Sequence, residues 1–560
     1  MNRADYLAQV EALHAPPELR ARIAALAWTV KPRRRFRPWM GVCACLAVVI
    51  LGGGAFLLTQ GGLGGSGAGG SGHDEGATTF MSYAGPVFPL TLGEKNASIT
   101  AERDLTLDFA PWGRVWVSNE EEVAAMEGLT EAERQEALEQ YNEWFTDGGY
   151  YTSSDDILVT DSYTLTNSSG EEQTVTVLYP FASGLHLLGR NTPTLTLDGA
   201  ELDTALQVGA YSGGFEGVWN GAIGGDPEGS VNLRQAESWE DYAAVLADGT
   251  YLANALGQGP DISNIPVTVY RFTEPYGPEA DDGAGIPNPS IRASFDLDYS
   301  ETVVLSWGFH AGRFDRENGS MVQGFSVPQP GERSYGQTYY LLVLGDDIEN
   351  LTTGGYVTGG TDSDTQALGD CGVTVERYES DLDAMLREIL YPEWEELRRR
   401  TYEQDGMELD VDFETWYRTV LEYLLSYGVL SPTGAERYGA GRLEDIAGDA
   451  NVIDRVCWLE AELTIPAGES VTLTASMTKE ASFDYACAHT ENQGVKGYDL
   501  VTEVGSNLNC TGQSATLLDR GLIEIVRQNF GFDLENGITT VALDPAQGHY
   551  YLEVRRLPQS

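Results

Sequence analysis

The chain has 560 residues, of which 42% are hydrophobic and 10% aromatic, and this excludes wholesale disorder because such a chain can bury a substantial core. Its formal net charge is −51, although the first 38 residues carry eight Lys and Arg side chains against three Asp and Glu. The negative charge therefore belongs to the rest of the chain. Its field repels nucleic acid and anionic lipid headgroups, which excludes both as partners of that part.

The basic tail at residues 1–37 contains two short amphipathic stretches on either side of Pro16 and Pro17. Apolar residues recur at helical spacing in both stretches. They are Tyr6, Val10 and Leu13 in the first, and Leu19, Ile23 and Leu26 in the second. A segment this short cannot bury these faces by itself. We expect them either to lie on the inner membrane leaflet or to bind a cytoplasmic partner.

Residues 38–60 are predicted to form one transmembrane helix. Trp39–Leu58 is an uncharged run of 20 residues, which matches the length that crosses about 30 Å of hydrocarbon. The basic sequence KPRRRFRP precedes it, and no Lys or Arg follows until Lys95. The positive-inside rule then predicts a single-pass cell-membrane protein with a cytoplasmic N-terminus and an extracellular C-terminus. The long segment before the apolar run favours an uncleaved signal anchor, with cleavage near Ala55 as the alternative.

Residues 61–78 form a Gly-rich linker, whose GGLGGSGAGGSG run is typical of a flexible tether. A first β-rich extracellular region is predicted for 79–360, with a helical insert at 118–146 that Ser118 caps. The run ILVTDSYTLTN, the turn SSGEE and the run QTVTVLYPF predict an antiparallel hairpin.

Helical periodicity predicts a helical region for 361–450, and alternating runs predict a C-terminal β-sandwich for 451–560. Within the latter, CWLEAELTIPAGESVTLTASMTK predicts a second hairpin around Pro-Ala-Gly-Glu. The predicted fold class is therefore mainly β with α insertions. It consists of two β-sandwich-like regions separated by a helical region and preceded by one transmembrane helix.

Catalytic and cofactor motifs do not occur in a fitting context. Ser476 to Lys479 match S-x-x-K, but the four residues end a predicted strand and the S-D-N and K-T-G companions are absent. Ala210 to Gly214 resemble a nucleophile elbow without a strand–turn–helix setting. No histidines pair at i, i+4 and H-E-x-x-H is absent. The sequence thus predicts no catalytic, cofactor-binding or metal-binding residue, and it favours a protein that is not an enzyme.

Closely spaced acidic residues recur along the extracellular part, and such pairs can begin a calcium site. The pairs are Asp296/Asp298, Asp346/Asp347, Asp362/Asp364 and Asp410/Asp412. None completes the twelve-residue loop signature, so we interpret them as solvated acidic turns. Glycoside hydrolysis needs two carboxylates that are distant in sequence, so a hydrolase with dispersed carboxylates remains an alternative.

Four cysteines follow the predicted membrane helix: Cys371, Cys457, Cys487 and Cys510. Four cysteines allow three connectivities. A Cys371–Cys457 bond would close off the helical region, and a Cys487–Cys510 bond would join strands of the last sandwich. The alternative is four small, buried thiols.

The segment DYLAQVEALHAPPELRARIAAL, followed by a basic flank and one membrane helix, resembles membrane-bound anti-sigma factors and related uncharacterised single-pass envelope proteins of Gram-positive bacteria. The resemblance covers residues 1–60. The segments YTLTN with VLYPF, GYDLVTEVGSNL and IVRQNFGFDLENGI are similar to parts of the same surface proteins. His14 lacks H-x-x-x-C-x-x-C companions, so the likeness is not to the zinc-binding kind. The resemblance implies that the tail binds a cytoplasmic regulator such as a sigma factor.

We therefore expect a membrane-anchored extracellular binding or sensing protein, with an anti-sigma-like envelope regulator as its more specific form. The flexible linker transmits little torque, so we expect signalling by proteolysis rather than by rigid rotation. The alternatives are a passive surface adhesion or binding module, whose tail only sets the topology, and an envelope hydrolase with dispersed carboxylates. The sequence does not identify the extracellular ligand.

Overall fold

The computed structural model describes residues 80–81, 85–126, 130–209, 262–278, 289–329, 336–359, 361, 365–405, 411–426, 430, 441–452, 455–484 and 492–558. The predicted tail, transmembrane helix and linker lie outside these residues. Among the helices that are described, none is both long and apolar enough to cross a membrane. The described chain is mainly β and contains several sheets, as the sequence predicts.

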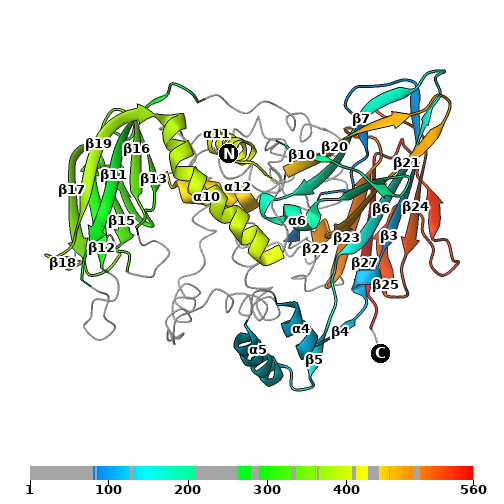
Figure 1. The fold of residues 1–560 in the computed structure, drawn as a ribbon, viewed down its shortest axis with the longest axis horizontal. Helices are drawn as coiled ribbons and strands as arrows, with labels where there is room; N and C mark the ends of the chain where they lie inside the picture. Colours follow the sequence, from blue (N-terminus) through cyan, green and yellow to red (C-terminus); the bar gives the residue numbers. More distant parts are fainter. Residues whose placement is uncertain are drawn as a thin grey trace, which may run out of the picture.

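Two β-sheet bodies lie on either side of a helical layer (Figure 1). The main body takes its strands from both ends of the described chain, within 80–209 and 455–558. The insert body takes its strands from 266–381, between those two parts. The predicted division at 360 and 450 is therefore not the division of the sheets. The region 451–560 does not form a sandwich by itself, because its strands at 455–465, 470–479 and 509–518 pair with strands of the N-terminal part.

The main body contains three sheets, and each includes strands from both parts of the chain. The seven-stranded sheet has the order β26 (Thr540–Ala542), β24 (Asn509–Leu518), β3 (Ile99–Asp108), β6 (Ile157–Asn167), β21 (Ser470–Lys479), β8 (Thr194–Leu197) and β9 (Ala200–Glu201). The four-stranded sheet has the order β10 (Ala205–Val208), β20 (Arg455–Ile465), β7 (Gln173–Ser183) and β2 (Thr91–Leu92). The five-stranded sheet has the order β1 (Phe80–Met81), β22 (Phe483–Asp484), β23 (Val495–Val501), β27 (His549–Arg556) and β25 (Ile523–Gln528).

The two predicted hairpins form strands but not hairpins. β6 and β7 do not pair with each other, because β6 pairs with β21 and β7 pairs with β20. The same holds for β20 and β21, so each turn connects two sheets as a β-arch. Alternation of buried and exposed residues along β6 turns its apolar side chains inward. A strand shows this alternation whether it is hydrogen-bonded to the next strand in sequence or packs against that strand from the opposite sheet.

The insert body is a sandwich of two antiparallel sheets. One sheet has the order β13 (Thr302–Trp307), β16 (Tyr339–Gly345), β11 (Pro266–Tyr276) and β19 (Gly372–Asp381). The other has the order β14 (Ala311–Asp315), β15 (Ser320–Ser326), β12 (Ser290–Asp296), β17 (Glu349–Tyr356) and β18 (Ala367–Leu368). Aromatic rings fill the space between them, with Phe325 stacked on Tyr339 at a centroid distance of 3.8 Å. Strands β18 and β19 occupy the start of the region that was predicted to be helical.

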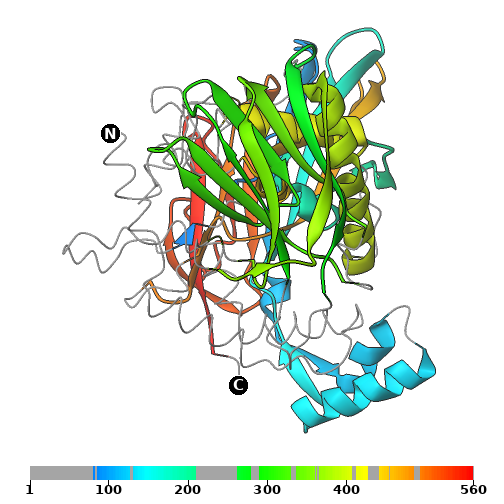
Figure 2. The same cartoon turned by 90° about the vertical axis from the view of Figure 1, so that its left-hand side faces the viewer.

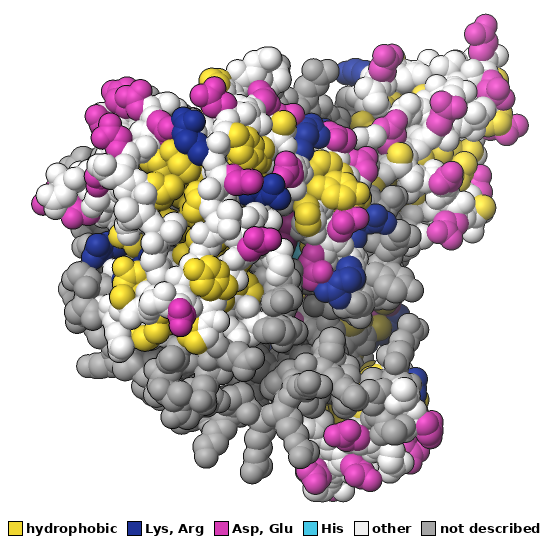
Figure 3. Space-filling model, turned by 60° about the vertical axis from the view of Figure 1, so that its left-hand side comes forward, with side chains coloured by type: hydrophobic (Ala, Val, Ile, Leu, Met, Phe, Trp, Pro, Cys, Tyr) yellow, Lys and Arg dark blue, Asp and Glu magenta, His cyan; other side chains and the backbone are white. Residues whose placement is uncertain are grey.

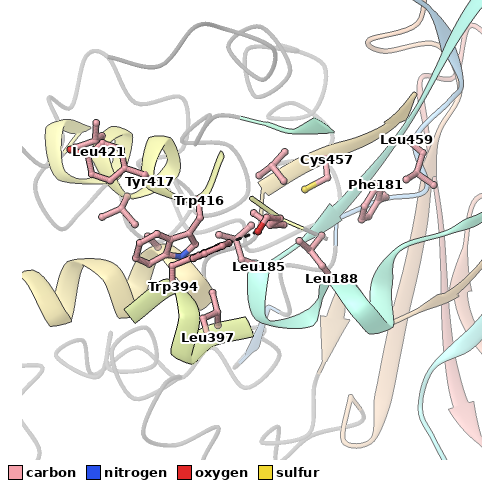
Figure 4. Close-up of a cluster of buried hydrophobic side chains, with 14 of the residues drawn as sticks. Phe181, Leu185, Leu188, Trp394, Leu397, Trp416, Tyr417, Leu421, Cys457 and Leu459 are labelled. Carbon is pink, nitrogen blue, oxygen red and sulfur yellow. Dashed lines mark hydrogen bonds between the residues drawn. The ribbon is translucent and has the colours of Figure 1, made fainter. Parts of the chain in front are cut away.

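The helical layer follows β19 and consists of α10 (Leu382–Asp405), α11 (Phe413–Ser426) and α12 (Leu443–Val452). Figure 4 shows Trp394 and Trp416 of this layer near Leu185 and Leu188 of the main body. The short helices η3 (Leu185–Leu187) and α6 (Leu188–Asn191) carry the last two residues. The Trp416 indole donates a hydrogen bond to Asn451 Oδ1 at 2.6 Å.

One hydrophobic core joins all three parts of the molecule. It contains Leu165 and Leu473 of the main body, Leu386 of α10, and Val269 and Leu342 of the insert body. Burial of apolar side chains contributes about 25 cal/mol for each Å² removed from water. The layer therefore fixes the insert body to the main body through a continuous apolar contact.

A charged pair is buried inside the main body. Arg103 and Asp161 form an ion pair at 2.8 Å, and both side chains have 0% exposure. Tyr163 and Tyr179 each donate a hydrogen bond to Asp161 Oδ2 at 3.0 Å. Burial raises the pKa of both phenols well above the usual value, so they remain donors.

Candidate functional site

A hairpin-shaped arm, described for residues 114–126 and 130–152, projects from the main body (Figures 1 and 2). It consists of β4 (Val115–Ser118), α4 (Asn119–Ala125), α5 (Glu131–Trp144) and β5 (Gly149–Thr152), and it follows η2 (Ala110–Trp112). The predicted insert at 118–146 corresponds to the two helices, and the capping role of Ser118 is confirmed. Ser118 Oγ accepts from the Glu121 amide at 3.2 Å, and Glu121 Oε2 accepts from the Ser118 amide at 3.1 Å.

The arm has a small core of its own. Val123, Ala137 and Tyr141 are buried together between the helices. Asn119 Nδ2 donates to Asn142 Oδ1 at 2.8 Å and to the Phe145 carbonyl at 3.1 Å, which joins the start of α4 to the end of α5. These contacts hold the helices against each other, so β4 and β5 are presented as a defined two-stranded ribbon.

Large apolar side chains on the arm remain exposed. Trp116 is 42% exposed, Tyr151 59%, Val115 59% and Trp144 44%. Trp116 and Tyr151 face each other across the ribbon, and their rings meet edge to face at a centroid distance of 4.9 Å. Exposed aromatic groups of this kind are typical of binding surfaces, because a partner can bury them at small cost in conformational entropy. The arm is therefore a candidate binding site.

Gly149 of β5 allows the Trp116 indole to pack closely against the ribbon, because it has no side chain. A Cβ atom at this position would lie 2.7 Å from Cζ2 of Trp116 and would also meet the backbone of β4. The guanidinium of Arg114 lies over the Tyr151 ring at 5.4 Å from its centroid. On the opposite face of β5, burial and the neighbouring Glu122 raise the pKa of Tyr150 to about 12. The residues of the ribbon are thus held by specific contacts although two of its rings face solvent.

A Ser–Asp–His grouping lies in the main body but is not arranged for nucleophilic catalysis. Asp499 accepts from Ser482 Oγ, and its Oδ2 lies 2.8 Å from His549 Nε2. The serine and the histidine both contact the carboxylate rather than each other, and Ser482 is only 1% exposed. Ser476 and Lys479 lie on strand β21, as the sequence predicts, rather than at the start of a helix, where S-x-x-K chemistry needs its serine.

Acidic residues from separate turns meet at one end of the insert body. Asp296, Asp298, Asp346, Asp347 and Glu349 line a shared depression. Several of them have partners: Arg377 binds Asp347 at 2.6 Å, and hydrogen bonds from Ser300 lower the pKa of Asp298. Within the described ranges, no three His, Cys, Asp or Glu side chains are grouped to hold a metal ion.

The remaining acid pairs do not add to this depression. Asp362, Asp364 and Asp410 lie outside the described residues. Asp412 accepts a hydrogen bond from the Thr415 amide at 2.7 Å and so caps the start of α11.

The Cys371–Cys457 disulfide bond that the sequence allows is not formed. Cys371 has a free thiol in the core of the insert body, whereas Cys457 is buried in the core that joins the three parts. The two residues belong to different clusters, which explains the failure of this pairing. Cys510 also has a free thiol, and Cys487 lies outside the described residues. Burial raises the pKa of the Cys371 and Cys510 thiols.

The predicted tail residues lie outside the described part: Tyr6, Val10, Leu13, Leu19, Ile23 and Leu26. Sequence reasoning missed the aromatic pair, although VWVS and GYYT on either side of the helical insert carried its signal. No protein-family model matches the chain, and no curated protein matches it either.

Proposed function

We propose that this chain is a single-pass surface binding protein that contacts its partner through the arm. The exposed aromatic pair Trp116 and Tyr151 carries the proposal. Both rings lie on an element that projects from the main body and has its own core. Rings that are held in place lose little entropy on binding, which suits them to anchor a partner.

The rest of the proposal concerns residues 1–78. Residues 38–60 anchor the chain in the cell membrane, with the tail in the cytoplasm and the β-rich part outside. The tail binds a cytoplasmic regulator such as a sigma factor, and occupancy of the extracellular part is signalled by proteolysis. Support comes from the apolar run, its basic flank and the amphipathic spacing of the tail.

Site-specific photocrosslinking tests the role of the arm in cells that display the full chain. A photoreactive phenylalanine replaces Tyr151 in one variant and Tyr276 in the control. The control is matched, because Tyr276 is 60% exposed and lies on the insert body. We expect a discrete crosslinked species from position 151 that is absent from position 276. Identical products from both positions, or none from 151, would refute the arm as the binding site.

A pull-down with residues 1–37 tests the tail. The comparison is with a Leu19→Asp, Ile23→Asp double variant, which places charge on the second amphipathic stretch. Capture of a sigma factor by the native tail alone would support the regulator. If both peptides capture the same proteins, the tail serves only to set the topology, and the chain is a passive binding module.

A further inference from the structure

We propose that the partner offers the arm an extended, arginine-bearing polypeptide segment, whose guanidinium groups stack on the rings of Trp116 and Tyr151. This inference rests on the proposed function, because it names the kind of partner that the arm binds. Three features of the described arm support it: the placement of its rings, its charge and its open strand edges.

One ring of the pair, that of Tyr151, already contacts a guanidinium within the chain. Arg114 lies over Tyr151 at 5.4 Å from the centroid, within the range of a cation–π contact. The Trp116 indole stands directly across the ribbon and remains 42% exposed. Indole binds cations more strongly than phenol does, and the planar guanidinium stacks on it better than an ammonium. A second guanidinium, supplied by the partner, can therefore make the same kind of contact with the ring pair that Arg114 makes.

The charge of the arm attracts a cationic segment. Residues 114–152 contain ten Asp and Glu against two arginines. Glu120 and Glu121 in the first turn of α4 are exposed, and acidic side chains gather on the arm in the lower right of Figure 3. Like-charge repulsion disfavours acidic partners, while a basic segment is steered toward the ribbon.

The strand edges suit an extended chain. β4 and β5 form a two-stranded sheet, and no other described strand pairs with either of them. Their outer edges therefore present backbone groups that a polypeptide can bind by strand addition. A glycan could stack on the rings but would gain little from the negative charge. The combination of rings, charge and edges thus favours a basic polypeptide.

The test measures binding of fluorescent octa-arginine to the full chain in nanodiscs of neutral lipid, by anisotropy at two salt concentrations. The variant is Trp116→Ala, Tyr151→Ala, and the matched control is Tyr276→Ala. We expect the double variant to weaken octa-arginine binding about tenfold, since two cation–π contacts are lost. The control should stay within about twofold, because general attraction to the acidic surface is unchanged. Thermal unfolding of both variants verifies that they fold.

Octa-lysine and chitohexaose complete the experiment. Octa-lysine carries the same charge without the planar group, so the double variant should change its affinity less than that of octa-arginine. Equal binding of octa-arginine to the native chain and the double variant would overturn the inference. If the double variant loses only chitohexaose binding, the arm remains the binding site but its partner is a glycan, which overturns the inference and leaves the proposed function intact.

Discussion

Glu444 on α12 contacts the insert body through one of its two carboxylate oxygens. The amide of Gly308 donates to Glu444 Oε1, whereas Oε2 is buried without a hydrogen-bond partner. Burial raises the pKa of this carboxyl to about 7, and the bond from Gly308 and the charge of Arg442 lower it less than burial raises it. The neutral acid is thus the form that the fold prefers.

The pH dependence of stability follows from this preference. An unfolded glutamate has a pKa near 4.5, so between that value and about 7 the folded state binds a proton that the unfolded state does not. Stability is then highest below the unfolded pKa and falls as the pH rises through about 7, by about 3 kcal/mol. We predict that Glu444→Gln removes this decline. Urea unfolding of both proteins at pH 5 and pH 7.5 measures it, and an equal slope in both would contradict the assignment.

Asp161 and Asp108 allow a matched comparison of buried and exposed ion pairs. Asp161 pairs with Arg103 at 0% exposure, whereas Asp108 pairs with Arg520, whose side chain is 49% exposed. Asp161→Asn leaves a buried guanidinium without its counter-charge and should lower the free energy of unfolding by about 3–5 kcal/mol. Asp108→Asn should lower it by less than about 1 kcal/mol. Chemical denaturation measures both, and similar losses would show that burial does not govern this pair.

Gly149 decides how the arm presents its rings. An added methyl group would meet the Trp116 indole and the backbone of β4, so Gly149→Ala should displace the ribbon and loosen the arm. Arg134 on α5 gives trypsin a cleavage site inside the arm. We predict faster cleavage there in Gly149→Ala than in Gly170→Ala, where no atom lies within 4 Å of the new Cβ. Equal rates would mean that the ribbon accommodates the methyl group.

The elements themselves were predictable from local pattern, and their pairing was not. The alternation in ILVTDSYTLTN and the cap at Ser118 predicted β6 and α4, because both depend on neighbouring residues. Strand β3 pairs in parallel with β24, which follows it by about 400 residues, and no local sequence pattern encodes that pairing. For the site, the apolar residues of β4 were visible in the sequence, but their exposure depends on the ribbon standing apart from the main body.

The main body requires both ends of the described chain. Strand β6 lies between β3 and β21, and β7 lies between β2 and β20. We predict that neither 79–209 nor 451–560 unfolds cooperatively when produced alone, because each leaves buried strand edges of the main body without partners. Circular dichroism during thermal unfolding measures this. A cooperative transition in either fragment would show that the sheets can close without the missing strands.

The β3–β24 contact also bears on how the chain matures. If residues 79–560 leave the cell N-terminus first, β3 emerges long before β24 and must persist as an open edge in the meantime. Contacts of such high sequence separation slow folding, since a long loop must close before they form. The insert body, whose strands are close in sequence, can assemble earlier. In that case the sheet stays half built until β24 follows β3, about 400 residues later, and protecting the open edge becomes a task for the secretion machinery rather than for the native fold.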